Sequence, residues 1–370
     1  MDRRETERLL DAIRKVRADG EPAAIATVVR VNGSAYRREG TRMLVRRDGT
    51  YECALSGGCL EPAVAEAAAR VIATGEPTIV SYDLSDDSVW GLGVGCGGAV
   101  DIRVERLEDD RITRDWLAIL DAGEAAVLVT PLRGVAGRII VRGNGRVLGG
   151  LTDPLLEQEA VARARARLDG SHPQSGCDQI RGADLLYEVT TPPPDLAIFG
   201  AGDDTVPLAR LAWTLGFSVT VVDVRAAFLT ASRFPGASLV CAHFSQFAGA
   251  LTLHSGTAVL VMNHHLERDQ QSFRFSLDSA APYIGVLGPR SRYETLLAGL
   301  AAQGYVPDAA RLARVRSPVG IALGAETPPE VALSIAAEIV AVRRGFAGGF
   351  LNGTTGSLHA SDDRRLLASS

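Results

Sequence analysis

The residues most suited to binding or reacting with a ligand lie in two short runs of glycine and cysteine. They are Ser56-Gly57-Gly58-Cys59-Leu60-Glu61 and Gly95-Cys96-Gly97-Gly98. Glycine lets the backbone turn sharply and approach a ligand closely, because no Cβ stands in the way. Each run therefore places a thiol where a ligand can reach it.

The first run opens a helix, since Pro62 suits a first turn and the apolar residues of 63–72 recur at helical spacing. Cys59 then lies at or just before a helix N-terminus, where free amides and the helix dipole attract anions and favour a thiolate. Arg37, Arg38 and Arg42 lie just upstream, so their guanidinium groups are expected to reach the same anion. The competing interpretation is structural: buried cysteines pack as small apolar residues, and glycine runs form turns.

A second pattern lies beyond Thr191-Pro192-Pro193-Pro194, a stiff linker. A strand over 195–199 leads into Gly200-Ala201-Gly202, a helix follows over 206–215, and the next strand ends in Asp223. This order predicts a dinucleotide-binding half-fold, in which Gly200, Gly202 and Asp223 would contact the ligand. Thr205 takes the place of the third glycine, and Asp203 and Asp204 put negative charge where a pyrophosphate would bind.

A strand over 257–262, which we expect to be fully buried in a parallel sheet, delivers Asn263-His264-His265 to its carboxyl end. Open α/β sheets place their sites at such ends, so His264 is a candidate ligand-binding residue. The alternative is a structural histidine in a polar loop.

The elements that position these residues predict an α/β protein. Residues 1–107 form an N-terminal domain, with strands at 23–31, 78–82 and 99–105 and a hairpin around Asp48-Gly49. Residues 108–190 repeat its pattern as a degenerate second copy without the cysteine, and Cys177 falls there in a polar loop. Residues 195–345 form a doubly wound, Rossmann-like domain with a parallel sheet, and 346–370 a flexible tail.

Composition excludes several classes of function. The 370 residues are 46% hydrophobic and 22% charged with a net charge of −5, so there is no basic face for nucleic acid. No apolar run is long enough to span a bilayer, and the charged N-terminus is no signal peptide, so we expect a cytoplasmic protein. Five cysteines without a Cys-x-x-Cys pair indicate reduced thiols. Lys15 is the only lysine, which excludes a Walker A loop.

The ordered set of motifs resembles the XdhC/CoxI family, whose members serve molybdenum hydroxylases such as xanthine dehydrogenase. The likeness spans residues 10–110 and 190–345. It includes both glycine–cysteine runs and these further segments: Gly33-Ser34, Met43-Leu44-Val45, Gly200-Ala201-Gly202, Val222-Asp223-Val224-Arg225, Val261-Met262-Asn263-His264, Tyr283-Ile284-Gly285 and Thr327-Pro328. The sequence differs from the family pattern at Tyr36, Asp203, Asn263 and Pro289.

The resemblance implies a chaperone that binds the molybdenum cofactor, holds it while a cysteine desulfurase assists its sulfuration, and inserts it into an apo-molybdoenzyme. Cys59 and Cys96 would then contact molybdenum, since a soft metal favours thiolate. The glycines beside them (Gly57, Gly58, Gly97, Gly98) would admit the pterin. The arginines at 37, 38 and 42 would bind its phosphate.

Two other functions stay open at this point. One is an NAD(P)-dependent oxidoreductase that uses the C-terminal domain, which Asp223 favours and Asp203 and Asp204 oppose. The other is a non-catalytic scaffold for a molybdoenzyme, in which the thiols only pack. A homodimer is compatible with each of these functions.

Overall fold

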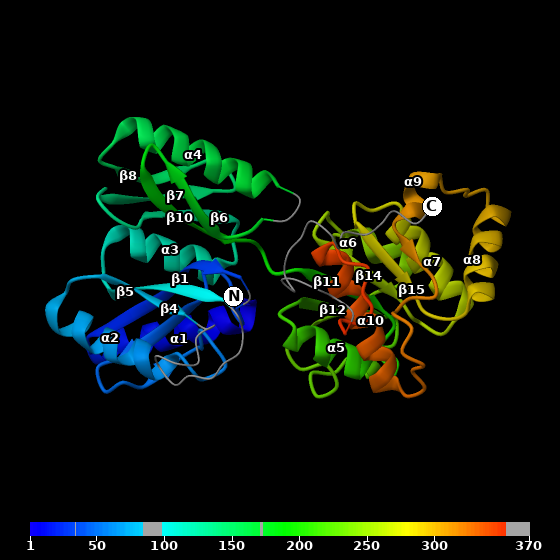
Figure 1. Ribbon diagram of the computed structural model, residues 1–370. Coiled ribbons are helices and arrows are strands. Elements are labelled where there is room, and N and C mark those ends of the chain that lie inside the picture. The colour runs from blue at the N-terminus through cyan, green and yellow to red at the C-terminus, as the bar shows by residue number, and fades with distance from the viewer. Residues whose placement is uncertain (34, 84–97, 171–172, 353–370) are drawn as a thin grey trace. The chain divides into compact units, whose positions relative to one another are not determined.

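The computed structural model describes residues 1–33, 35–83, 98–170 and 173–352, and the chain divides into two compact units (Figure 1). The first unit runs from Met1 to Pro192 and the second begins at Pro193, within the three-proline linker. The two units have separate cores. In the described part of the chain, no helix combines the length and apolar character needed to cross a bilayer.

The first unit opens with a five-stranded antiparallel sheet in the order β3-β2-β1-β5-β4. Its elements in chain order are α1 (Arg3–Asp19), β1 (Ala23–Asn32), β2 (Arg42–Arg46), β3 (Tyr51–Glu52), α2 (Glu61–Thr74), β4 (Thr78–Asp83) and β5 (Ala99–Arg106). Alternate residues of β1 face opposite sides, as the pleat of a strand requires. Ala24 and Ala26 pack in the core under α2, and Ala23 packs in the core with α1.

A second antiparallel sheet follows in the order β8-β7-β6-β10-β9. Its elements are α3 (Arg111–Ala122), β6 (Ala126–Pro131), β7 (Gly137–Arg142), β8 (Val147–Leu151), α4 (Pro154–Asp169), β9 (Gly176–Ile180) and β10 (Ala183–Thr190). Both the order of elements along the chain and the order of strands in the sheet are those of the first sheet. The first unit is therefore built from two copies of one α-β-β-β-α-β-β motif.

One local prediction in the second copy is wrong. Cys177 lies in strand β9 and not in a polar loop, and its thiol donates to the Val29 carbonyl at 2.9 Å. Burial raises the pKa of this thiol to about 12, which makes it inert. The polar residues of β9 concealed the strand because β9 lies at the sheet edge.

The second unit holds a six-stranded parallel sheet in the order β13-β12-β11-β14-β15-β16. The strands are β11 (Asp195–Phe199), β12 (Ser218–Asp223), β13 (Ser238–Cys241), β14 (Thr257–Val261), β15 (Tyr283–Val286) and β16 (Val315–Arg316). The helices are α5 (Thr205–Thr214), α6 (Phe247–Ala250), α7 (Leu266–Leu277), α8 (Arg290–Ala302), α9 (Ala309–Ala313) and α10 (Pro328–Arg344), with short 3₁₀ turns at Ala226–Phe228 and Phe244–Gln246.

Helices cover both faces of this sheet, which confirms the predicted Rossmann-like layering. Leu196 and Ile198 of β11 pack under α5 and α10, whereas Ala197 and Phe199 pack under α7 and α8. The chain builds β12 and β13 on one side of β11 and then crosses to β14 on the other side. The point where the winding reverses therefore lies between β11 and β14, and ligands bind at the carboxyl end of such a point.

Candidate functional site

The thiol of Cys59 lies in the loop immediately before helix α2. The helix begins at Glu61, and Leu60 takes the N-cap position without a side-chain cap. Cys59 is half-buried against the core under α2, and its thiol donates to the Ser56 hydroxyl at 3.4 Å. The loop therefore presents one edge of the thiol while the core fixes the other.

Ser56 and Glu61 hold this loop in shape. The Glu61 carboxylate accepts hydrogen bonds from the backbone amides of Leu55 (2.9 Å) and Ser56 (2.7 Å) and from the Ser56 hydroxyl (2.5 Å). The Ser56 oxygen in turn accepts from the amides of Gly58 and Leu60. These polar contacts of the loop thus converge on one serine and one glutamate.

Glu61 is fully buried and still ionised. Burial raises the pKa of its carboxyl, but the hydrogen bonds from Ser56 and the backbone outweigh burial and hold that pKa below its ordinary value. The positive end of α2 therefore already contains a carboxylate of the same chain. The motif alone predicts an external anion at that end, and it does not reveal the role of Glu61.

The two glycines of the loop face open space. Gly57 and Gly58 are exposed, and a Cβ added to either would have no neighbour within 4 Å in the described ranges of the chain. Gly58 has φ +112, which only glycine adopts without strain, whereas the conformation of Gly57 does not require glycine. Packing among the residues that the structure describes therefore leaves the absence of a side chain at Gly57 unexplained.

The three candidate arginines have different surroundings. Arg37 binds the Glu5 carboxylate at 2.5 Å, and Arg42 forms a buried ion pair with Glu188 at 2.8 Å. Arg38 is half-buried and has no ion pair among the residues that the structure describes. Of the three, Arg38 is the one whose charge is not already paired within the described chain.

Part of the second glycine–cysteine run lies outside the described residues. Cys96 and Gly97 belong to the undescribed stretch 84–97, and Gly98 is buried just before β5. Within the described ranges, no group of three or more His, Cys, Asp or Glu side chains is placed to hold a metal ion.

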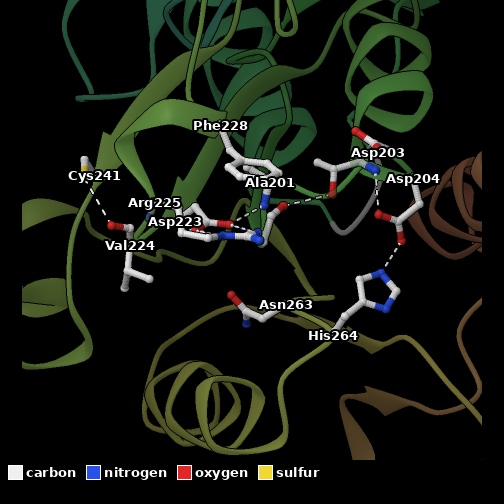
Figure 2. A network of polar contacts seen from close by, with 12 residues as sticks. Ala201, Asp203, Asp204, Asp223, Val224, Arg225, Phe228, Cys241, Asn263 and His264 are labelled. Carbon is white, nitrogen blue, oxygen red and sulfur yellow. Dashed lines mark hydrogen bonds and ion pairs between the residues drawn. The ribbon is translucent and has the colours of Figure 1, made fainter.

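The remaining candidate residues meet at the carboxyl end of the parallel sheet, shown in Figure 2. Gly200 follows β11 with φ +115, and a Cβ there would lie 2.4 Å from the Met262 carbonyl oxygen. A Cβ on Gly202 would lie 2.6 Å from a carboxylate oxygen of Asp204. Both glycines therefore have packing reasons within this chain.

Asp223 at the end of β12 is saturated by its own neighbours. Its carboxylate accepts from the Ala201 amide (2.8 Å), from the Arg225 amide (2.8 Å), and from the Arg225 guanidinium (2.8 and 2.9 Å). Burial raises the pKa of Asp223, but these hydrogen bonds outweigh burial and leave it below its ordinary value. Arg225 also stacks on Phe228 at 4.1 Å (Figure 2). A ribose hydroxyl would have to displace one of these donors.

Asp204 and His264 form a pair across the winding reversal between β11 and β14. The His264 Nε2 atom lies 2.7 Å from a carboxylate oxygen of Asp204, whose other oxygen caps α5 at the Thr205 amide (Figure 2). This hydrogen bond raises the pKa of His264 above its ordinary value, and the ring stays exposed. His264 has φ +55, an uncommon backbone state outside glycine.

Sequence reasoning missed the arginines of this region. Arg233 donates to the carbonyl of Ala201 at 3.0 Å and binds the exposed Asp203 at 2.7 Å. Both carboxylates that the sequence places at the mouth therefore have partners in this chain, Asp203 in Arg233 and Asp204 in His264. Arg233 lies 30 residues beyond Asp203, and no spacing rule signals such a contact.

Known proteins match both units. Residues 16–83 match the family model described as "XdhC and CoxI family", and residues 196–339 match the "XdhC Rossmann domain". A Bacillus subtilis protein named as a probable subunit of xanthine dehydrogenase is 34% identical over 344 residues, covering 91% of this chain and 97% of the relative. The Escherichia coli molybdenum cofactor insertion chaperone PaoD is 24% identical over 325 residues, covering 88% of this chain and 84% of the relative.

A solved structure has a similar fold. The crystal structure of a protein described as a xanthine dehydrogenase from Bacillus halodurans matches with a TM-score of 0.74 and 29% identity. The match covers 90% of this chain and 95% of that one.

Proposed function

The chain belongs to the XdhC and CoxI family, and from this premise we propose that it binds the molybdenum cofactor and inserts it into a molybdoenzyme of the xanthine dehydrogenase class. The observation that carries the proposal is the similarity over most of both chains to a relative named as a molybdenum cofactor insertion chaperone. The cofactor is here the cargo of the protein, which is handed on after binding.

The loop before α2 fits such a cargo. Cys59 offers a soft sulfur ligand for molybdenum. The exposed surface at Gly57 and Gly58 leaves room for the ring system of the cofactor. Arg38 offers a guanidinium without an internal partner among the described residues, for the terminal phosphate of the cofactor. Cys96 would add a second sulfur.

The finer parts of the proposal concern what happens during binding. While the cofactor is held, its metal centre is shielded from water, and a cysteine desulfurase supplies the sulfur for its terminal ligand. Because Glu61 and Ser56 fix the backbone beside Cys59, we expect Cys59 to contribute more to binding than Cys96. A homodimer is compatible with this proposal.

The structure offers less support for an oxidoreductase. The carboxylate that would hold the ribose of NAD(P) already accepts hydrogen bonds from the Ala201 amide and from Arg225. A scaffold without cofactor binding would leave the open glycine at position 57 without a purpose.

An anaerobic titration with molybdenum cofactor released from a molybdoenzyme tests the proposal. We expect saturable binding by the full chain, a large loss in Cys59→Ser and a smaller loss in Cys96→Ser. Cys241→Ser is the matched control, because this exposed thiol lies on β13 in the other unit. Thermal melting shows that each variant is folded.

Each outcome has a definite meaning. Absence of binding by the unmodified protein overturns the proposal. Binding that survives in both Cys59→Ser and Cys96→Ser supports cofactor binding but removes the thiols from the site. Equal losses in the two variants contradict the ranking and indicate a site shared by both sulfurs.

A further inference from the structure

The registers of the two sheets show which residues of the two copies correspond. Ala23 pairs with Arg46 in the first sheet, and Ala126 pairs with Arg142 in the second. Counting four residues back along β2 and β7 matches Arg42 with Arg138. On the neighbouring strand of the first sheet, Glu105 pairs with the residue two positions after Ala23. On the neighbouring strand of the second sheet, Glu188 pairs with the residue two positions after Ala126, so the two glutamates correspond.

Of the two matched arginine–glutamate combinations, only one forms an ion pair between the copies. Arg42 and Glu188 form an ion pair between the copies, with side chains only 12% and 8% exposed. Their counterparts Arg138 and Glu105 form no ion pair with each other in the described part of the chain. Arg138 instead binds Asp110 and Thr113, and Glu105 binds Arg103. One side of the contact between the copies is therefore closed and the other is not.

A difference in helix length accounts for the open side. Helices α1 and α3 each end at a glycine three residues before the first strand of their copy, but α1 has 17 residues and α3 has 12. The missing five residues correspond to about 7.5 Å of helix at the N-terminus of α3. A groove of about 540 Å³ opens there, lined by the start of α3 and by strands β5, β6 and β7.

The groove joins apolar surface with five charged side chains, of which three are arginines and two, Glu105 and Asp110, are carboxylates. Arg103, Arg111 and Arg138 line it, and Arg138 directs only one of its terminal nitrogens at Asp110 and Thr113. The remaining donors of Arg138 have no partner in the ranges that the structure describes, and Arg111 is 80% exposed. Ile112 and Val135 supply apolar contact on the same walls. A few charged groups on apolar walls, in a volume of this size, are typical of small-molecule sites.

We propose that this groove binds a phosphorylated heterocycle, with its phosphate on Arg138 and Arg111 and its ring against Ile112 and Val135. Guanidinium groups bind phosphate oxygens in a bidentate way. The Thr113 amide at the start of α3 is already capped by the Asp110 carboxylate, so the arginines alone supply the attraction. Arg103 directs a terminal nitrogen at the Pro131 carbonyl (3.0 Å) and so spans the groove between β5 and β6. The site uses neither Cys59 nor the C-terminal unit, so it stands apart from the cofactor proposal.

Calorimetric titration of the full chain with inorganic phosphate, AMP, GMP and CMP tests this site. We expect at least one nucleotide to saturate one site per chain, and to bind more tightly than inorganic phosphate because the ring adds contact. Arg138→Gln should raise the dissociation constant by about tenfold or more, since it removes a charged hydrogen-bond donor. Arg146→Gln on the exposed β7–β8 turn is the control with the same change of charge.

A second variant keeps the test independent of Arg138. Arg103→Leu gives β5 the residue that the other copy has at the matched position, Leu186, and should also weaken binding. The proposal is overturned if no nucleotide saturates at millimolar concentration, if inorganic phosphate binds as tightly as every nucleotide, or if folded Arg138→Gln and Arg103→Leu bind as the unmodified chain does.

Discussion

Replacing Glu61 with glutamine tests whether one buried carboxylate organises the Cys59 loop. Glutamine has nearly the same shape but carries no charge, and its amide nitrogen replaces one carboxylate oxygen. The Ser56 hydroxyl, which now donates to that oxygen, would face a donor instead. Its own oxygen is already engaged by Gly58, Leu60 and Cys59, so it cannot simply reverse its role.

The size of the effect follows from the three hydrogen bonds that Glu61 accepts. Bonds to a charged group contribute about 1.5–3 kcal/mol and neutral ones about 0.5–1.5 kcal/mol. The two backbone hydrogen bonds survive in weaker form, at a loss of about 1 kcal/mol each. Loss of the Ser56 hydrogen bond costs about as much as the two backbone losses together. The smaller penalty for burying an amide offsets part of this sum, which leaves a net loss of about 2 kcal/mol.

The effect also has a predicted dependence on pH. The pKa of Glu61 is lower in the folded protein than its ordinary value, so its contribution to stability is complete above about pH 4.3, the unfolded value. The contribution is lost as the pH falls through the lower, folded value. The difference between the two proteins should therefore narrow in acid, because glutamine does not titrate.

Hydrogen exchange of the amides at positions 55, 56, 58 and 60 measures the local opening of this loop. A loss of about 2 kcal/mol corresponds to roughly 30-fold faster exchange at these amides near neutral pH. Glu66→Gln is the control, because Glu66 is exposed on the same helix. Unchanged exchange in folded Glu61→Gln would refute the reasoning that the carboxylate holds the loop.

Three further predictions concern other parts of the chain. Glu188→Gln leaves Arg42 buried without its partner, and we expect the first unit to lose about 3–5 kcal/mol, measured by urea unfolding; an unchanged midpoint would contradict this. Asp204→Asn should lower the pKa of His264 toward its ordinary value, because it removes the hydrogen bond that raises it, and an NMR titration measures the shift. In the unsubstituted protein, the ion pair between protonated His264 and Asp204 stabilises the fold below about pH 6.5. This contribution is lost as the pH rises through the raised pKa of His264 in the folded protein. Gly57→Ala should change stability by less than about 0.5 kcal/mol, since its Cβ meets no atom of the described residues, yet weaken cofactor binding in the anaerobic titration; unimpaired binding would place the cargo elsewhere.

The sequence predicted the parts of the fold that depend on local pattern. The apolar runs that became β1, β11 and β14 lie where the sequence predicted strands. The turn at Asn144-Gly145 between β7 and β8 stands where the first copy has Asp48-Gly49 between β2 and β3, because turn chemistry survives when core residues change.

The parts that the sequence did not show depend on neighbours far along the chain. Strand β8 contains Gly149 and Gly150, which weaken a strand signal, and here they fit against β7: a Cβ on Gly149 would lie 2.2 Å from the Arg138 carbonyl. The pairing of Arg42 with Glu188 joins residues 146 positions apart, so the arginine looked available for a ligand. Glu61 lay inside the motif, but its burial is set by tertiary packing.

The sheets of this protein do not interleave along the chain, and this has a consequence for its synthesis. The strands of the first sheet lie between residues 23 and 106, those of the second between 126 and 190, and those of the third between 195 and 316. Each sheet can therefore close as soon as its own segment has left the ribosome, in the order of translation. The first copy must then wait with Arg42 unpaired until Glu188 emerges, so the last strand of the second copy completes the core of the first unit.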